Sequence, residues 1–437
     1  MVNSKIAPTF AIQNDITMRK TIITLLLALV TIAGQAQTQV QPTTALLGSW
    51  SGKLKAGLTS LTLVLNLEQA EGYVKVSLDS PDQGVKGISA FKEFLSDDSL
   101  AVKIEQLNVT YRARLKEGKL DGTFSQMGMS FPLILEKGVP EVKRPQMPKP
   151  PYPYETEEVT FKNEADGATL AGTLTYPVDY NKNAKKKPVV VLFVSGSGQQ
   201  NRDEELMNHK PFLVIADYLA RQGIATLRYD DRATGQSVGG DVKNATTKDF
   251  ARDAAAGLDY LRSKKAFGKV GILGHSEGGT IAFMLGAQKK VDFIVSLAGP
   301  TVKGDTLLAA QSNRILSLNG QPANMTVEQY RQTAASMNMP WLNWFNDYDP
   351  SDNIRQTRCP VFALNGDRDC QVISSLCLPA LKQLLPPSKK NLIKEYPDLN
   401  HLFQHCKTGL VEEYGQIEET ISEEVLKDIA QWLSQLK

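Results

Sequence analysis

Cysteine and histidine are scarce in this sequence, and neither sign of charge is in excess. Of the four cysteines, Cys370 and Cys377 form a single C-x6-C spacing that is not a zinc-binding pattern, so neither a metal nor another cofactor is expected. In an exported protein, Cys359, Cys406 and these two thiols allow three disulfide pairings, and free buried thiols are the equal alternative. The 49 basic and 47 acidic residues nearly cancel and no long basic block occurs, which excludes nucleic acid as an expected partner.

Long hydrophobic runs are also missing. The most apolar stretch, residues 22–33, is too short to span a membrane comfortably. It follows Met18 and two basic residues, and small residues lead up to Ala36, which is the pattern of an export signal cleaved after Ala36. We therefore predict an N-terminal extension and signal peptide over 1–36, with translation starting at Met18. The mature protein is predicted to be periplasmic or secreted, without a stable membrane span; the alternative is a hydrophobic helix of the mature protein.

Residues 37–140 carry the signals of a β-rich accessory domain. Several short runs, such as "GYVKVSLDS", show partial alternation of apolar and polar residues. Turn pairs such as Glu71-Gly72 and Asp121-Gly122 separate them. We predict a small antiparallel β-sheet or barrel. Six prolines between Pro140 and Pro153 then predict an extended linker over 141–154.

The remaining residues, 155–437, alternate between strand and helix patterns. Near-continuous apolar runs such as "KKPVVVLFV" are typical of strands buried on both faces of a sheet. The alternation predicts an α/β fold, a mostly parallel sheet with helices on both faces. Between Gly299 and Cys359 only helical signals occur, and we predict a helical lid over about 300–356.

One short stretch of this second domain, "LGHSEGG", has the form of a nucleophile turn. Gly274 to Gly278 read G-x-S-x-G, directly after a predicted buried strand and directly before a predicted helix. Glycines at both ends permit a turn too sharp for side chains. This setting predicts Ser276 as a nucleophile; a serine that only caps the helix is the alternative reading.

A serine nucleophile needs a general base, and the chain has only four histidines. His401 lies in "PDLNHLF", just past a late predicted strand, and is the first candidate. His405 is the second. His275 is expected to point away from Ser276, and His209 precedes the nucleophile in the chain.

The acid and the oxyanion donors are predicted from the ends of other strands. Asp367 and Asp369 compete as the acid after "PVFALNG", and Asp369 is preferred because it lies farther beyond the strand end. The backbone N–H of Glu277 is expected to face an oxyanion, together with that of Ser197 or Gly198 in the glycine-rich loop after the first buried strand.

The segments "VSGSGQQNRDEE", "RYDDRATGQS", "LGHSEGG", "PVFALNGDRDCQV" and "LNHLFQ" resemble the α/β-hydrolase superfamily. Within it, the chain is most similar to bacterial serine esterases of the serine aminopeptidase-like group, over about residues 155–437. The resemblance implies an α/β-hydrolase fold with Ser276 as nucleophile, Asp369 as acid and His401 as base. Ala233 stands where the family often has glycine. The domain ahead of it resembles β-rich modules that precede such hydrolases in exported proteins.

These residues predict a serine hydrolase that cleaves a small carboxylic ester through an acyl-enzyme. One alternative is an amidase or aminopeptidase with the same triad, in which an acidic side chain would hold the substrate amine; the candidates are Glu204, Glu205 and Glu277. The other is a glycan- or lipid-binding protein with an inactive hydrolase domain. The predicted lid carries Trp341, Trp344 and Phe345, which either line a substrate pocket or pack within the lid.

Overall fold

A computed structural model of the protein describes residues 45–56, 59–81, 85–139 and 143–436. The described residues form two compact units, and the division between them falls between Lys143 and Arg144. The predicted export segment, residues 1–36, lies outside the described residues. Among the helices that are described, none has the length and apolar character needed to cross a bilayer.

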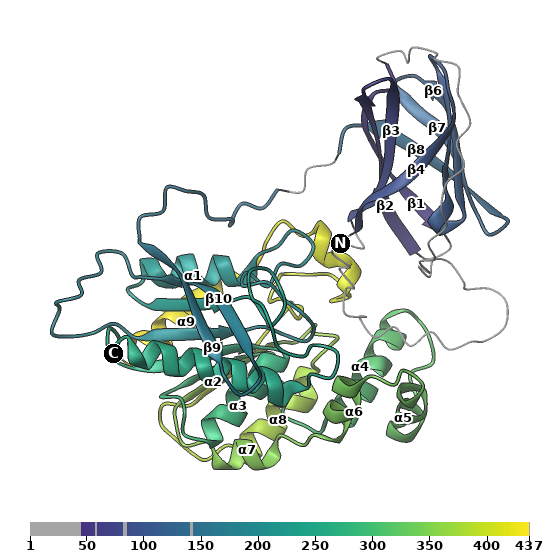
Figure 1. Ribbon diagram of the computed structural model, residues 1–437. Coiled ribbons are helices and arrows are strands. Elements are labelled where there is room, and N and C mark those ends of the chain that lie inside the picture. The colour runs from purple at the N-terminus through teal and green to yellow at the C-terminus, as the bar shows by residue number, and fades with distance from the viewer. Residues whose placement is uncertain (1–44, 57–58, 82–84, 140–142, 437) are drawn as a thin grey trace. The chain divides into compact units, whose positions relative to one another are not determined.

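The first unit is a closed antiparallel β-barrel in which every strand pairs with the next one along the chain (Figure 1). The barrel closes because β1 also pairs with β8, with Ser51 opposite Glu136. Closure leaves no exposed sheet edge for pairing with other chains. The strands are β1 (Gly48–Ala56), β2 (Thr59–Ala70), β3 (Tyr73–Ser80), β4 (Val85–Leu95), β5 (Ser99–Ile104), β6 (Val109–Lys116), β7 (Lys119–Gln126) and β8 (Met129–Lys137).

Alternating burial along the strands fills the barrel interior with apolar side chains. In β3, Val74, Val76 and Leu78 point inward, while the residues between them are exposed or half-buried. Trp50 is also buried, and its indole N–H donates to Leu46 O at 2.9 Å. The apolar positions of the predicted strands are therefore the core positions of the barrel.

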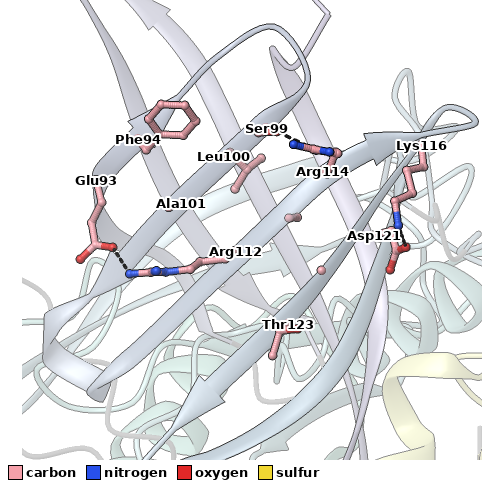
Figure 2. Close-up of a pocket in the computed structure, with 12 residues that line it drawn as sticks. Glu93, Phe94, Ser99, Leu100, Ala101, Arg112, Arg114, Lys116, Asp121 and Thr123 are labelled. Carbon is pink, nitrogen blue, oxygen red and sulfur yellow. Dashed lines mark hydrogen bonds and ion pairs between the residues drawn. The ribbon is translucent and has the colours of Figure 1, made fainter.

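The outer surface of the barrel carries a hollow of about 690 Å³ over β4 to β7 (Figure 2). Basic side chains line it, but acidic neighbours pair with them. Arg112 lies 3.3 Å from Glu93, and Lys116 lies 2.8 Å from Asp121. These exposed pairs contribute little stability, but they neutralise the charge that an anionic ligand would need.

The second unit is built on an eight-stranded sheet with the order β16-β15-β14-β13-β11-β12-β10-β9. The β9–β10 hairpin and the β10–β12 pair are antiparallel, and every other neighbouring pair is parallel. The predicted mostly parallel sheet is therefore confirmed. Its strands are β9 (Thr156–Asn163), β10 (Ala168–Thr175), β11 (Val190–Val194), β12 (Ala225–Tyr229), β13 (Val270–His275), β14 (Ile294–Leu297), β15 (Val361–Gly366) and β16 (Leu392–Tyr396).

Helices cover both faces of this sheet (Figure 1). Val191 and Phe193 of β11 pack on one side in a core shared with α1 (Pro211–Arg221) and α9 (Glu423–Ser434). The intervening Leu192 packs on the other side with α2 (Thr247–Ser263) and α3 (Glu277–Ala287). Two further elements, α8 (Ser374–Leu384) and the 3-10 helix η3 (Val411–Gln416), were not expected from the sequence.

The segment predicted as a lid is helical and lies between β14 and β15. It contains α4 (Gly304–Leu318), α5 (Val327–Ala335), α6 (Pro340–Asp347) and α7 (Ser351–Gln356). Pro340 begins α6, a position where its missing N–H costs no hydrogen bond. Trp341 therefore lies in the first turn of α6.

The segment predicted as a linker is bound to the second unit from Arg144 onward. The Arg144 guanidinium donates to the carbonyls of Met207, Gly415 and Ile417 at 2.9 to 3.0 Å. Gln146 donates to Ile421 O at 2.7 Å. This part of the chain therefore belongs structurally to the second unit.

Candidate active site

Ser276 lies between the end of β13 and the start of α3 in a strained conformation. Its φ is 52° and its ψ is −118°, in a region that side chains other than glycine rarely adopt. Its backbone N–H donates to Leu297 O at 2.8 Å, which fixes the turn to β14. The half-buried serine is thus held at the carboxyl edge of the parallel strands, where ligands bind in open α/β sheets.

The glycines around Ser276 are required by close backbone packing. A Cβ on Gly274 would lie 2.0 Å from Gly278 O, and a Cβ on Gly278 would lie 2.1 Å from Val194 O. Both distances are far below van der Waals contact, so a side chain on Gly274 would force the turn itself open, and one on Gly278 would push the turn away from β11. The G-x-S-x-G spacing therefore reflects the packing of the turn against the sheet.

Asp369 and His401 form a buried pair beside this turn. Asp369 follows β15 and His401 follows β16, and 2.7 Å separates His401 Nδ1 from Asp369 Oδ2. Asp369 Oδ1 accepts from the backbone N–H groups of Gln371 and Val372 at 2.7 and 2.9 Å. The carboxylate is thus oriented by three donors, and because an ionised carboxylate can only accept, the proton of the contact with His401 lies on Nδ1.

The His401 ring also lies close to the serine turn. Its centroid is 4.6 Å from that of His275, the residue before Ser276. The structure therefore brings Ser276, Asp369 and His401 to one edge of the sheet. The competing Asp367 instead accepts from Asp398 N at 2.7 Å in a turn contact.

The other histidines have partners of their own. His405 is largely exposed and pairs with Glu419 at 2.8 Å. His209 is buried between Thr420 Oγ1 and Tyr414 O, and burial lowers its pKa to about 4, so its ring is neutral. His275 is buried and pairs with Glu204 at 2.9 Å.

The glycine-rich loop that contains Ser197 runs beside Ser276. A Cβ placed on Gly196 would lie 3.2 Å from the Ser276 Cβ, so the absence of a side chain lets the loop approach the serine. Gly196 N–H donates to Glu204 Oε1 at 2.7 Å. The predicted second oxyanion donor, Ser197, is thus on the loop that adjoins the serine turn.

Asp231 holds the same loop through hydrogen bonds, a role that the sequence did not predict. Its carboxylate accepts from Ser195 Oγ at 3.1 and 3.2 Å and from Gln200 N at 2.9 Å. Burial raises the pKa of Asp231 well above its ordinary value. The motif "RYDDRATGQS" contains this residue, but nothing in the spacing of the motif indicates its partner.

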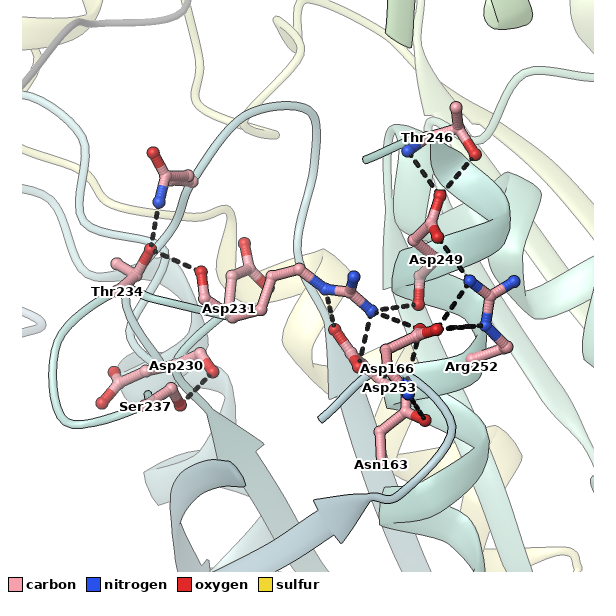
Figure 3. Close-up of polar contacts among 12 residues, drawn as sticks. Asn163, Asp166, Asp230, Asp231, Thr234, Ser237, Thr246, Asp249, Arg252 and Asp253 are labelled. Atoms are coloured by element: carbon pink, nitrogen blue, oxygen red, sulfur yellow. Dashed lines mark hydrogen bonds and ion pairs between the residues drawn. The ribbon is translucent and has the colours of Figure 1, made fainter. Parts of the chain in front are cut away.

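A buried ion cluster holds that motif in place (Figure 3). The Arg232 guanidinium lies 2.7 Å from the Asp253 carboxylate and 2.9 Å from the Asp166 carboxylate. Burial opposes the charge, but these carboxylates raise the pKa of Arg232 above its ordinary value. The next residue, Ala233, has a φ of 53°, so the turn keeps the left-handed backbone that glycine favours although the residue is alanine.

Helix α6, in the segment predicted as a lid, contacts the serine turn through a half-buried hydrogen bond. The Trp341 indole N–H donates to Glu277 Oε1 at 2.8 Å. Burial raises the pKa of Glu277, and the bond from Trp341 opposes that rise. Trp341 also stacks on Phe345, whereas Trp344 stacks on Tyr348. Of the three lid aromatics, Trp341 is therefore the one bonded to the residue after Ser276.

All four cysteines lie in the second unit and are free thiols. Cys370 and Cys377 are buried, and burial raises the pKa of both thiols, to about 12 for Cys370 and about 11 for Cys377. They are poor nucleophiles at neutral pH.

Comparison with known proteins extends these observations. Residues 209–343, which include Ser276, match the family described as "Serine aminopeptidase, S33". Esterase EstD of Thermotoga maritima is 26% identical over 331 residues, which are 73% of this chain and 74% of that protein.

Solved esterase structures are similar at lower identity. The Pyrococcus furiosus esterase Pf2001 is 18% identical with a TM-score of 0.44, over 68% of this chain and 99% of that one. Est1E from Butyrivibrio proteoclasticus, bound to ferulic acid, is 16% identical with a TM-score of 0.41, over 64% of this chain and 97% of that one. From its sheet and its serine turn, the second unit, called the hydrolase unit, has an α/β-hydrolase fold, and it follows an eight-stranded antiparallel β-barrel in the chain.

Proposed function

We propose that the protein is a serine hydrolase that cleaves small carboxylic esters. Ser276 is the nucleophile, His401 the general base and Asp369 the group that orients His401. The observation that carries this proposal is the 2.7 Å contact between His401 Nδ1 and Asp369 Oδ2, next to a serine in a strained turn. A buried carboxylate oriented by backbone N–H groups is suited to hold an imidazole and to stabilise its protonated form.

In the proposed reaction, Ser276 Oγ attacks the ester carbonyl while His401 Nε2 takes its proton. The backbone N–H groups of Glu277 and Ser197 stabilise the negative charge on the carbonyl oxygen. The intermediate collapses, His401 gives its proton to the leaving alcohol, and an acyl-enzyme remains. Water, deprotonated by His401, then attacks the acyl group and releases the acid and free Ser276.

The engagement of the nearby acidic side chains favours an ester over an aminopeptidase substrate. Glu204 is occupied by His275 and Gly196, and Glu277 by Trp341. Glu205 is exposed, 3.4 Å from the Lys210 ammonium. None of these three carboxylates is therefore open to hold a substrate amine. The relative EstD is also an esterase by name.

The test is labelling with a fluorophosphonate probe, followed by peptide mapping. The wild type is expected to carry the adduct on the peptide that contains Ser276 and to hydrolyse short p-nitrophenyl esters. Ser276→Ala loses both, while the matched control Ser263→Ala, at the exposed end of α2, keeps both. Cleavage of aminoacyl amides without cleavage of esters would refute the ester assignment, and an unlabelled folded wild type would refute the triad.

We also propose that the enzyme acts outside the cytoplasm, on the strength of the export pattern that ends at Ala36. N-terminal sequencing of the protein recovered from the producing cell is expected to begin at residue 37. A cell-associated protein that retains residues 18–36 would contradict cleavage there.

A further inference from the structure

Beside the Asp369–His401 pair lies a second buried carboxylate–imidazole pair, Glu204 and His275. Glu204 Oε1 is 2.9 Å from His275 Nδ1, and the other ring nitrogen, Nε2, is 3.0 Å from the backbone oxygen of His401. The side chains of His275 and Glu204 are only 8% and 5% exposed. Asp369 thus holds the ring of His401, the proposed general base, and His275 holds the backbone carbonyl of the same residue.

Proton counting defines the charge of His275. A backbone carbonyl oxygen can only accept a hydrogen bond, so the ring nitrogen Nε2 must carry a proton. A carboxylate can also only accept, so Nδ1 must carry a second proton if Glu204 is ionised. The Gly196 N–H donates to the same carboxylate oxygen at 2.7 Å, so Glu204 Oε1 acts as an acceptor toward both groups. His275 is then an imidazolium.

The charged surroundings agree with this assignment. Burial acts to lower the pKa of His275, but the charge and hydrogen bond of Glu204, the carbonyl of His401 and the charge of Asp369 outweigh it and raise that pKa. The ionisable groups that face His275 are therefore Glu204 from the loop before α1, Asp369 from the loop after β15, and His401 itself.

The pair joins three separate segments of the site. Gly196 belongs to the oxyanion loop, His275 immediately precedes Ser276, and His401 is on the loop after β16. A single carboxylate and a single ring therefore connect the predicted oxyanion donors, the nucleophile turn and the general base.

The pair is poorly designed for stability alone. Glu204 Oε2 is buried and, among the described residues, has no hydrogen-bond partner. An ionised carboxylate with one unsatisfied oxygen costs free energy that its ion pair offsets only in part. Glu204 also has a left-handed backbone, with a φ of 51°, which adds strain. A cost of this kind next to a reactive serine is typical of a functional constraint.

We propose that Glu204 and buried, protonated His275 form a charged positioning pair that aligns the oxyanion loop and the His401 main chain with Ser276. The pair touches no reacting atom, and its role rests on the proposed serine-hydrolase function.

The first experiment measures the charge of His275 in the intact wild-type protein. With ¹⁵N-labelled histidine, the four imidazoles are assigned by His→Gln variants. His275 is expected to show two protonated ring nitrogens at pH 7.5. Glu204→Gln removes the charge that offsets the burial of an imidazolium, so it is expected to leave a neutral ring with one protonated nitrogen. A neutral His275 in the wild type would overturn the proposal, whether or not any variant folds.

The second experiment separates positioning from general stability. Glu204→Gln keeps the size of the side chain and an acceptor for Gly196 N–H, but it removes the charge. We expect kcat to fall about 100-fold with KM within about twofold, since a misplacement of about 1 Å costs a factor of this order. Glu419→Gln is the matched control, because Glu419 accepts from His405 at 2.8 Å away from the site, and it should keep the wild-type kcat.

The outcomes distinguish this inference from the proposed function. A folded Glu204→Gln protein with wild-type kcat would overturn the positioning role while leaving the serine hydrolase intact. Equal losses in Glu204→Gln and Glu419→Gln would also overturn it. A wild type that neither reacts with fluorophosphonate nor cleaves esters would refute the proposed function itself, and the positioning role with it.

Discussion

At the scale of single residues, Ser276, Glu204 and Ala233 are among the residues with a positive φ, which side chains other than glycine normally avoid. Ser276, Glu204 and Ala233 have φ values of 52°, 51° and 53°. Each such residue costs about 1 kcal/mol or more, so the surrounding contacts must enforce it. Ser276 and Glu204 have functional roles in our proposals, whereas Ala233 has an exposed side chain and no such role.

Ala233→Gly is therefore expected to stabilise the protein by about 0.5 to 1 kcal/mol without changing ester hydrolysis. Glycine removes the steric cost of the left-handed backbone, at a smaller cost in the entropy of the unfolded chain. Chemical denaturation measures the free energy of unfolding. Ala256→Gly, within helix α2, is the matched control and should destabilise by about 1 kcal/mol. A destabilised Ala233→Gly would show that the turn does not hold this conformation in solution.

The two aspartates after β15 offer a direct comparison at the residue scale. Asp369→Asn keeps the shape of the side chain but loses the charge that fixes the proton on His401 Nδ1, so kcat is expected to fall on the order of 10³ to 10⁴-fold. Asp367→Asn, two residues earlier, alters only a turn contact and should leave kcat within about twofold. Steady-state hydrolysis of p-nitrophenyl esters decides between them, and the reverse result would make Asp367 the acid.

At the scale of elements, the hydrogen bond between α6 and α3 ties the lid to the serine turn. Trp341→Phe removes the donor from buried Glu277 and is expected to destabilise the protein by about 1 to 2 kcal/mol at pH 8. The effect should be smaller near pH 4. Burial already raises the pKa of folded Glu277, and loss of the indole donor raises it further. Below the pKa that Glu277 has in the unfolded chain, the side chain is neutral in both proteins, so their stabilities differ less. As pH rises above that value, the variant loses more stability than the wild type.

Trp344→Phe is the control for this prediction, because Trp344 stacks on Tyr348 and belongs to the same helix. Its effect on urea denaturation is expected to be the same at both pH values. If Trp341→Phe were equally independent of pH, the indole N–H would not be bonded to an ionising Glu277.

Local signals explain which elements could be predicted from the sequence. The strands around "VSGSG" and "LGHS" are buried on both faces, so their apolar runs identify them, and the glycines around Ser276 identify the turn. Helix α8 escaped prediction because Pro379 interrupts its pattern. Closure of the barrel could not be predicted either, because alternation is the same in an open sheet and in a barrel.

In the candidate site, some residues could be predicted from local sequence signals, and others depend on contacts between distant parts of the chain. Ser276 and His401 follow from the turn motif and from chain order. The Glu204–His275 pair joins positions 71 residues apart, and Asp231 meets a loop about 30 residues earlier in the chain. Pairing of this kind depends on how the strands are ordered in the sheet, and no spacing in one sequence reveals it.

At the scale of the whole molecule, the residues after the barrel are part of the hydrolase unit. Arg144 bridges the loop that precedes α1 and the loop around η3, which lie more than 200 residues apart in the chain. Arg144→Ala removes three hydrogen bonds from a cation to half-buried carbonyls, and we expect a loss of about 2 to 4 kcal/mol.

That loss should appear as a fall of roughly 3 to 7 °C in the melting temperature of the hydrolase unit. Arg355→Ala is the matched control. Among the ion pairs of the described residues, Arg355 pairs only with exposed Asp352, one helical turn away. The variant should therefore melt within about 1 °C of the wild type. A truncated chain that begins at residue 144 should likewise be more stable than one that begins at 155. Equal melting of the two truncated chains would show that the proline-rich segment is only a tether, and the hydrolase unit would then begin where the sequence alone places it.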